Sequence, residues 1–265
     1  MNPFFVARIT YISYNEKDMK NKKFKAILSV IGYFLLVIAV CVSAGFIFHA
    51  QYYDSIYVSG ISMSPTLNGT EEEKVGSVVD FGIMDSHDSA LKHIKRFSIV
   101  STYYPDEIDY DLTTGKLRAN AKQKIKRIIA LPGESFKIEN SKLYVNGEYI
   151  PYTFNINPKI ENGYTGKDIN REDQPLGEDE YWVLGDNRSN SRDSGALNLA
   201  IKKENLVGVL VAIEGTAQLK VKNYRCDFCG KTYSKQPSLC GKCSGGSFSV
   251  QYDLINKKYT WPKYF

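Results

Sequence analysis

The sequence has little of several features that would indicate particular functions. It has no internal repeat and no low-complexity stretch, and its three histidines lack the partner pattern of histidine-based catalysis. The net charge of +5 is too small and too unevenly placed to indicate nucleic-acid binding. With 43% hydrophobic and 24% charged residues, the 265-residue chain has the composition of a folded protein of one or two domains.

The positive charge is concentrated at one end of the chain. Residues 1–25 carry six basic and two acidic residues, which accounts for +4 of the net +5. Residues 26–48 then form a run of 23 residues without a charge, and no second run of this kind follows. A helix of this length spans a hydrocarbon core of about 30 Å, so the sequence predicts one transmembrane helix.

Because lysine and arginine concentrate on the cytoplasmic side of membrane helices, we expect residues 1–25 in the cytoplasm and the chain from residue 49 onward outside it. A cleaved secretory signal is the alternative, since Val42-Ser43-Ala44 resembles a small-residue cleavage site. The apolar run exceeds the roughly 7–15 residues of a signal's apolar region, which favours the anchor.

Residues 49–218 contain short runs rich in β-branched and aromatic residues, separated by glycine, asparagine, aspartate and proline. This pattern predicts a mainly β domain. Asn146-Gly147 lies between two such runs and predicts a two-residue hairpin. Residues 219–265 differ, because they hold four of the five cysteines and a tail rich in lysine and aromatic residues. We interpret them as a separate small module.

Three segments of the β domain stand out in order along the chain. The first is VSGISMSPT at residues 58–66, the second is IKRIIALPGE at residues 125–134, and the third is GDNRSNSRDS at residues 185–194. Alone, each would be read as a turn, a solvated lysine in a strand, or a polar surface loop. The ordered set of three is much harder to attribute to structure alone.

The set resembles the signature segments of the bacterial type I signal peptidases. The basic N-terminal segment, the single transmembrane helix and the β domain expected outside the cytoplasm also fit that family. The resemblance covers roughly residues 20–215. It implies a membrane-bound serine endopeptidase that removes signal peptides from exported preproteins, with a serine-lysine dyad on a mostly β fold shared with self-cleaving repressor proteases. It also implies cleavage after small-x-small sites and no catalytic cofactor.

By this resemblance, Ser62 corresponds to the nucleophile and Lys126 to the general base. A lysine accepts the serine proton only when it is neutral, so its pKa must lie well below the ordinary value near 10.4. Desolvation is the main means of lowering it. Ile125, Ile128 and Ile129 supply apolar neighbours in the sequence.

Further roles follow from the same resemblance. Ser191 corresponds to the serine that orients the lysine, and the backbone N–H of Ser62 to an oxyanion donor. Some relatives add a serine hydroxyl two residues before the nucleophile, where this chain has Gly60. The third segment is expected to be held by charged residues, namely Asp186, Arg188 and Asp193. The substrate pocket is expected to be lined by Ile56, Val58 and Ile125.

Two departures from the family pattern bear on local geometry. Asp193-Ser194 is followed by Gly195, where relatives commonly have an arginine that forms a salt bridge. We expect Arg188 or Arg192 to replace it. Residues 97–102, FSIVST, keep the strand character of the segment between nucleophile and lysine but lose its usual Gly-Asp turn.

The cysteines of the last segment form two pairs. Cys226 and Cys229 make one CxxC motif, and Cys240 and Cys243 make another, with ten residues between the motifs. This spacing predicts a structural four-cysteine zinc ribbon. Two disulfides are the alternative, because we place the segment outside the cytoplasm. Cys41, within the apolar run, is interpreted as a packing residue.

The expected function is therefore signal-peptide cleavage at a bacterial cell membrane. The expected partners are preproteins and membrane lipid, with the export machinery as an additional partner. Two alternatives stay open. One is a specialised relative that processes or helps assemble a few surface proteins. The other is an inactive relative that only binds exported chains, although a binder would need neither Ser62 nor Lys126.

Overall fold

The structure is a computed structural model that describes residues 3–106, 109–156 and 168–265. The chain divides into two units, residues 1–52 and residues 53–265. The first unit contains the helix α1, Pro3–Tyr52. Its segment Asn21–His49 has a mean hydropathy of 2.6 and is long and apolar enough to cross a membrane. The predicted span, residues 26–48, lies inside this segment.

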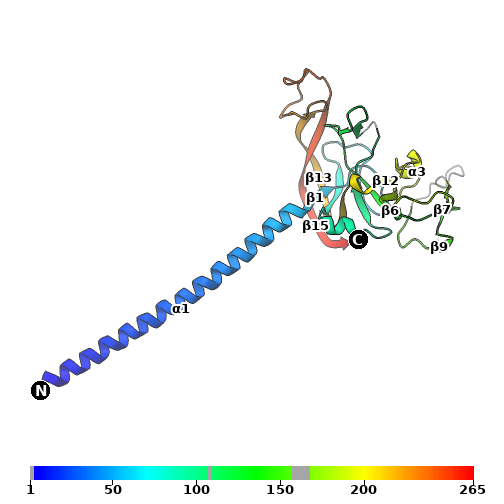
Figure 1. The fold of residues 1–265 in the computed structure, drawn as a ribbon. Helices are drawn as coiled ribbons and strands as arrows, with labels where there is room; N and C mark the ends of the chain where they lie inside the picture. Colours follow the sequence, from blue (N-terminus) through cyan, green and yellow to red (C-terminus); the bar gives the residue numbers. More distant parts are fainter. Residues whose placement is uncertain (1–2, 107–108, 157–167) are drawn as a thin grey trace. The chain divides into compact units, whose positions relative to one another are not determined.

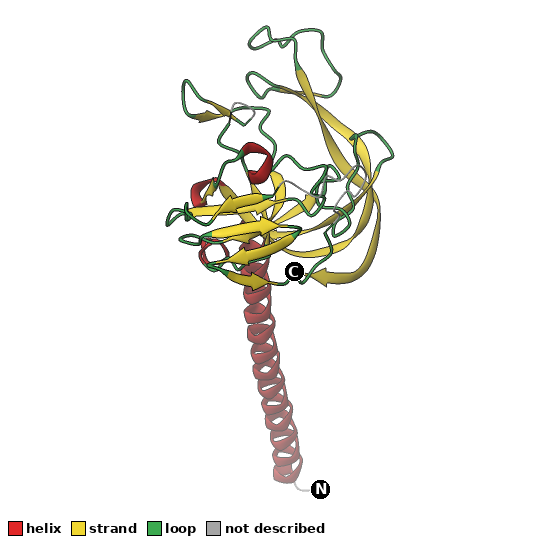
Figure 2. Ribbon diagram, turned by 90° about the vertical axis from the view of Figure 1, so that its right-hand side faces the viewer, coloured by secondary structure: helices red, strands yellow, loops and turns green. Residues whose placement is uncertain are grey.

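The second unit is mainly β, as the sequence predicts (Figures 1 and 2). Its large sheet has the order β1-β2-β13-β3-β6-β11-β12, and β14 and β15 also pair with β13. The strands of this sheet are β1 Tyr53–Tyr57, β2 Val78–Asp85, β3 Ile99–Thr102, β6 Lys124–Ala130, β11 Glu180–Leu184, β12 Ile201–Lys202, β13 Leu206–Cys226, β14 Thr232–Tyr233 and β15 Phe248–Tyr264. Its strands pair in antiparallel fashion throughout the described residues.

A second sheet of four strands has the order β10-β7-β8-β9. Its strands are β7 Phe136–Glu139, β8 Lys142–Val145, β9 Glu148–Ile150 and β10 Ile169–Arg171. The Asn146-Gly147 hairpin is confirmed, because both residues have positive φ and Val145 pairs with Glu148. The remaining short elements are β4 Tyr110–Asp111, β5 Lys116–Leu117, α2 Asp88–Lys92, α3 Ser194–Leu197 and the 3-10 helix η1 Lys203–Asn205.

Among the residues that the structure describes, buried apolar side chains gather in three clusters. One joins the second sheet to β6 and β11 and contains Phe136 and Trp182. Another lies on β3, β6, β11 and the start of β13. The third contains Met63, Leu67 and Ile99, and so packs the segment after β1 against the large sheet. This third cluster fixes the loop that carries Ser62.

The strand β13 is the central strand of the large sheet. Its first residues pair with β3, its middle pairs with β2 on one edge and β15 on the other, and its last residues pair with β15 and β14. The boundary predicted near residue 218 therefore falls inside a continuous strand. The segment after the cysteines also returns along β13 as far as Ala212, which pairs with Tyr264.

Close packing of β2 against β13 requires a glycine at position 82. A Cβ atom on Gly82 would overlap the backbone carbonyl of Ala212 on β13. We expect Gly82→Ala to lower the free energy of unfolding by about 1–3 kcal/mol, because backbone at this contact has to shift. Thermal unfolding of the full chain in detergent, followed by near-ultraviolet circular dichroism, measures this change.

The matched control is Gly246→Ala, since a Cβ there would meet its nearest atom at an ordinary 3.7 Å. Its effect should stay within about 0.5 kcal/mol. Equal Tm values for the two variants would contradict this account of the β2–β13 contact.

Candidate active site

The loop after β1 presents Ser62 beside the large sheet. Val58 donates its backbone N–H to Asp80 on β2, which ends the β1 ladder and starts the loop. Met63 and Leu67, on either side of the following turn, are fully buried. Ser62 therefore sits directly before a buried anchor residue, and the position of its hydroxyl is set by the core.

Lys126 lies on β6 and points its amine at this loop. Its Nζ atom is 2.7 Å from the Ser62 Oγ atom and 3.0 Å from the Ile125 carbonyl oxygen. The side chain is almost completely buried, with Lys126 only 4% exposed. The structure thus brings together the two residues that the sequence predicts as nucleophile and base, which lie 64 positions apart.

The surroundings of Lys126 favour its neutral form. The pKa of its amine is lowered from 10.5 to about 8, mainly by burial and to a smaller extent by the nearby charge of Lys124, while Asp193 and Asp186 act in the opposite direction. The cause is desolvation, because an ammonium ion loses its hydration in this site. An appreciable fraction of Lys126 is consequently neutral near pH 8, beside a serine hydroxyl.

The Ser62 backbone N–H is available as an oxyanion donor. Within the described part of the chain it donates to no other group, whereas the next residues form a turn in which Ser64 donates to Ile61. Gly60 has φ of +78°, and the space where its Cβ would lie is open. Glycine at this position is explained by backbone conformation, since positive φ disfavours other residues.

The third segment is fastened to the dyad by a buried ion pair that the sequence analysis did not find. Asp186, fully buried, accepts hydrogen bonds of 2.8 and 2.6 Å from Arg127 on β6. Arg127 also donates to the Phe97 carbonyl and stacks on Phe154. Arg127 is adjacent to Lys126, so this pair links β6 to the third segment.

Asn187 makes the second link, and it too was not predicted. Its backbone N–H donates to the Ser62 carbonyl at 3.0 Å, and its side-chain amide donates to the Ile61 carbonyl at 3.2 Å. The residue is buried. Its place inside the segment at residues 185–194 was the only signal in the sequence.

The charged residues predicted to hold the third segment do so in different ways. Asp193 caps the N-terminus of α3 and accepts from the Gly185 N–H, so it contacts backbone rather than a cation. Arg188 donates to the Gly185 carbonyl. Arg192 pairs with Asp106 at an exposed site. Neither arginine bonds to Asp193, so the expected replacement for the arginine missing at Gly195 is wrong.

Ser191 lies beside the dyad, but its predicted bond to Lys126 is not among the contacts of the lysine. Its Oγ atom is buried and has no hydrogen-bond partner among the described residues. A Cβ on Gly185 would overlap both this hydroxyl and the Ser62 carbonyl oxygen, which places Ser191 close to the loop that carries Ser62. A buried hydroxyl without a hydrogen-bond partner costs free energy, so the Ser191 hydroxyl is available to bond a group next to the dyad.

The three residues predicted for the substrate pocket belong to one apolar cluster. Val58 is buried in it, and Ile56 and Ile125 pack against it while remaining partly exposed. They lie on the two chain segments that carry Ser62 and Lys126. The surface that they leave open beside the dyad is therefore apolar.

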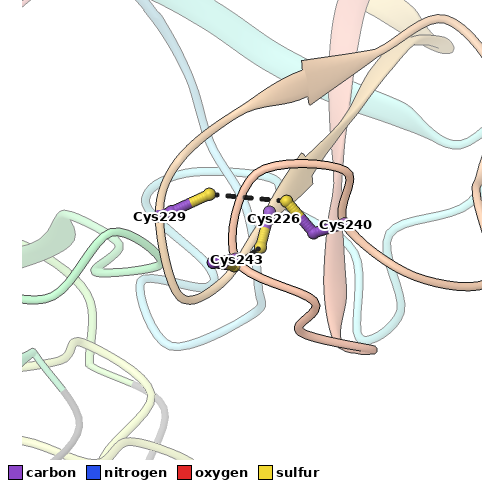
Figure 3. Close-up of side chains that lie close together, drawn as sticks. All are labelled: Cys226, Cys229, Cys240 and Cys243. Carbon is purple, nitrogen blue, oxygen red and sulfur yellow. Dashed lines mark hydrogen bonds between the residues drawn. The ribbon is translucent and has the colours of Figure 1, made fainter.

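The four cysteines of the last segment converge at the tip of the β13–β15 hairpin (Figure 3). All four sulfur atoms lie within 4.8 Å of one another, with 3.6 Å between Cys226 and Cys243 and 3.5 Å between Cys229 and Cys240. Bonds of about 2.3 Å from a tetrahedral zinc would separate thiolates by roughly 3.8 Å. The donor set and its spacing fit such an ion, whereas a disulfide needs about 2.05 Å.

Comparison with known proteins agrees with this site. The family model of signal peptidase, peptidase S26, matches residues 28–213, a range that contains both Ser62 and Lys126. A signal peptidase I of Bacillus amyloliquefaciens is 30% identical over 194 residues, or 72% of this chain and 89% of that protein. The signal peptidase I V of Bacillus subtilis is 32% identical over 161 residues, or 58% and 80%.

A solved signal peptidase I from Enterococcus faecalis is 26% identical and covers 44% of this chain and 96% of that one, with a TM-score of 0.34 that is too low to bear on the fold. The family match spans well over half of the sequence and both members of the dyad. The cysteine cluster lies outside it. The chain therefore belongs to the signal peptidase family, peptidase S26.

Proposed function

We propose that this protein cleaves signal peptides from exported preproteins with Ser62 as the nucleophile and Lys126 as the general base. The observation that carries the proposal is the 2.7 Å contact between the Ser62 hydroxyl and a buried lysine amine. Burial lowers the pKa of that amine to about 8, so it can accept a proton near neutral pH. An inactive binding protein would need neither group.

The reaction then has two halves. Neutral Lys126 takes the Ser62 proton while Oγ attacks the scissile carbonyl, and the oxyanion is stabilised by the Ser62 N–H. The tetrahedral intermediate collapses to an ester on Ser62, and the Lys126 ammonium protonates the leaving amine. Water, deprotonated by Lys126, next hydrolyses the ester and regenerates both side chains. Ser191 is proposed to hydrogen-bond the lysine and hold its orientation.

Specificity is proposed to favour small residues one and three positions before the cut. The supporting observation is the apolar cluster of Ile56, Val58 and Ile125 beside the dyad. In an extended substrate, the side chains one and three positions before the cut point to the same face, because side chains alternate along a strand. An apolar surface at this place favours small apolar side chains over charged ones.

We further propose that α1 anchors the enzyme in a bacterial cell membrane, with residues 1–25 in the cytoplasm and the β unit outside. The basic residues before the span support this orientation. Preproteins arrive at that outer surface during export, so contact with membrane lipid and export machinery is part of the proposal. A structural zinc, held by the four cysteines, would cross-link the tip of the β13–β15 hairpin.

Removal of either dyad member tests the mechanism. Ser62→Ala and Lys126→Ala should each reduce cleavage of a model preprotein at least about a thousandfold, because nucleophile and base act as a unit. Mass spectrometry of the products in lipid or detergent locates the cut. The matched controls are Ser64→Ala in the same loop and Lys137→Ala on β7, which should cleave at near the wild-type rate. Cleavage that survives both dyad changes would contradict the mechanism.

The pH dependence tests the protonation state of the base. Because the neutral amine is the active form and burial lowers its pKa to about 8, kcat/KM should rise as pH increases through 8 and then level off. Lys124→Ala removes a like charge and should move the midpoint to higher pH. A rate that is flat between about pH 6 and 9, or a midpoint near that of free lysine, would count against a lysine base.

Metal content tests the cysteine site. We expect about one zinc per chain by elemental analysis, lost in Cys240→Ser and retained in Cys41→Ser, because a structural site uses four thiolates. Chelation should lower Tm in the wild type and in Cys41→Ser but not in Cys240→Ser. Two disulfides found by thiol alkylation and peptide mapping, with no bound metal, would refute the zinc site.

A further inference from the structure

The hairpin of β13 and β15 continues beyond the point where β13 leaves β2. The last β2 pairing is between Val78 and Gln218, whereas β13 and β15 stay paired as far as Cys226 and Phe248. We name residues 219–254 the arm; it includes the cysteine tip (Figure 1). It lies entirely outside the family match at residues 28–213.

The arm is fastened to the body of the β unit by several hydrogen bonds. Leu219 exchanges backbone hydrogen bonds with Gly76 and Ser77, and the Tyr252 hydroxyl donates to the Glu73 carbonyl at 2.7 Å. The Glu73 carboxylate in turn meets Lys122 at 3.0 Å and the Tyr57 hydroxyl at 3.3 Å. Glu73 thus joins the arm to the end of β1 and to the segment before β6.

The charge state of Glu73 suits this role. Burial acts to raise the pKa of its carboxyl, but hydrogen bonds from Ser59, Lys122 and Tyr57 outweigh burial and lower it. The carboxylate therefore stays ionised at neutral pH and keeps these contacts. These contacts hold the arm against the body of the β unit, so the position of the arm does not depend on the cysteine tip alone.

Between the arm and the body lies a groove of about 450 Å³. Lys222, Arg225 and Tyr252 line it from the arm, and Tyr57, Ser59 and Gln123 line it from the body. Ser59 precedes Ser62 by three residues, and Gln123 precedes Lys126 by three. The groove therefore borders both segments that carry the dyad, at residues that precede Ser62 and Lys126.

The direction of the groove follows from its neighbours. Tyr57 and Ser59 alternate along the chain with Ile56 and Val58, which are proposed to contact residues one and three before the cut, so the groove faces the side to which even-numbered substrate residues point. A strand advances about 3.3 Å per residue, so a substrate extended along this edge would enter the groove about four to seven residues before the cut. That part of the substrate precedes the scissile bond, not follows it.

The lining of the groove is polar. It consists mainly of phenol, amide and hydroxyl groups and three cations. Lys122 is paired with Glu73 and Lys222 with Asp253, whereas Arg225 has no carboxylate partner among the described residues. Glu71 and Glu72 line an adjoining hollow together with Gly60 and Lys122, and neither Lys222 nor Arg225 belongs to its lining. An acidic side chain facing the arm would find its partner in Arg225.

We propose that the arm is the outer wall of an extended substrate site, which binds a polar segment about four to seven residues before the cut and favours an acidic residue opposite Arg225. This inference rests on the proposed function only for the identity of the bound molecule, which is the signal peptide of a preprotein. The arm would then add contacts for the polar stretch of a signal peptide to those of the dyad cleft.

The test uses the full-length protein in detergent and synthetic peptides around one small-x-small site, with aspartate or lysine placed six residues before the cut, a position whose side chain points to the groove side of an extended substrate. The wild type should show a kcat/KM about fivefold higher for the aspartate peptide, the size expected of one partly exposed ion pair. Arg225→Gln should remove this preference and Arg225→Glu should reverse it. Lys220→Glu, on the same strand but outside the groove lining, should keep it.

Two further measurements make the result decisive. A peptide with only three residues before the cut should be cleaved equally by every variant, and zinc content should be unchanged, because Arg225 adjoins Cys226. If the short peptide loses rate in parallel with the long ones, Arg225 acts only on the fold and the proposal is wrong. The same preference in Arg225→Glu as in the wild type would also overturn it.

Binding separates this proposal from the proposed function. Fluorescence anisotropy with labelled peptides and the Ser62→Ala protein reports on the groove without any cleavage. A charge preference in binding that Arg225→Glu reverses supports the groove even if the wild type cleaves no peptide, in which case only the protease mechanism fails. No charge preference in binding, together with normal cleavage, refutes the groove alone.

Discussion

The buried contact between Lys126 and Ser62 is the interaction on which the rest of the site depends. A lysine in water is charged and a serine hydroxyl is a weak nucleophile, so neither is useful alone. Removing Lys126 from solvent costs free energy, because the ammonium form is disfavoured there. Burial thereby favours the neutral form, and the result is an amine with a pKa of about 8 that lies 2.7 Å from the hydroxyl.

The surrounding structure can be understood as support for that contact. Met63 and Leu67 anchor the serine loop, the pair of Arg127 and Asp186 fixes the third segment to β6, and Asn187 ties the same segment to the loop. Three stretches far apart in the chain are thereby held against one another. The long strand β13 then carries the arm away from this centre, and Glu73 fastens the arm beside the same cleft.

Much of this organisation could be predicted from the sequence, because it depends on local patterns. The uncharged run predicts the apolar helix, Asn146-Gly147 the hairpin, and the ordered segments the dyad. What could not be predicted depends on contacts across the fold. Arg127 is next to Lys126, but its partner Asp186 lies 59 positions away. Arg192 contacts Asp106 and not Asp193, and the groove beside the arm forms only because β15 returns along β13.

The proposed mechanism depends most on one property of Lys126, namely that its amine loses its proton near pH 8 because it is buried beside Ser62. The most direct measurement is a carbon-13 NMR titration of the lysine Cε signals in the full-length protein, with Lys126→Arg used to assign the resonance. We predict that this signal titrates with a midpoint near 8, well below the ordinary 10.5. A midpoint near 10.5 would show that the lysine is solvated and charged, and it would contradict a serine-lysine mechanism in this protein.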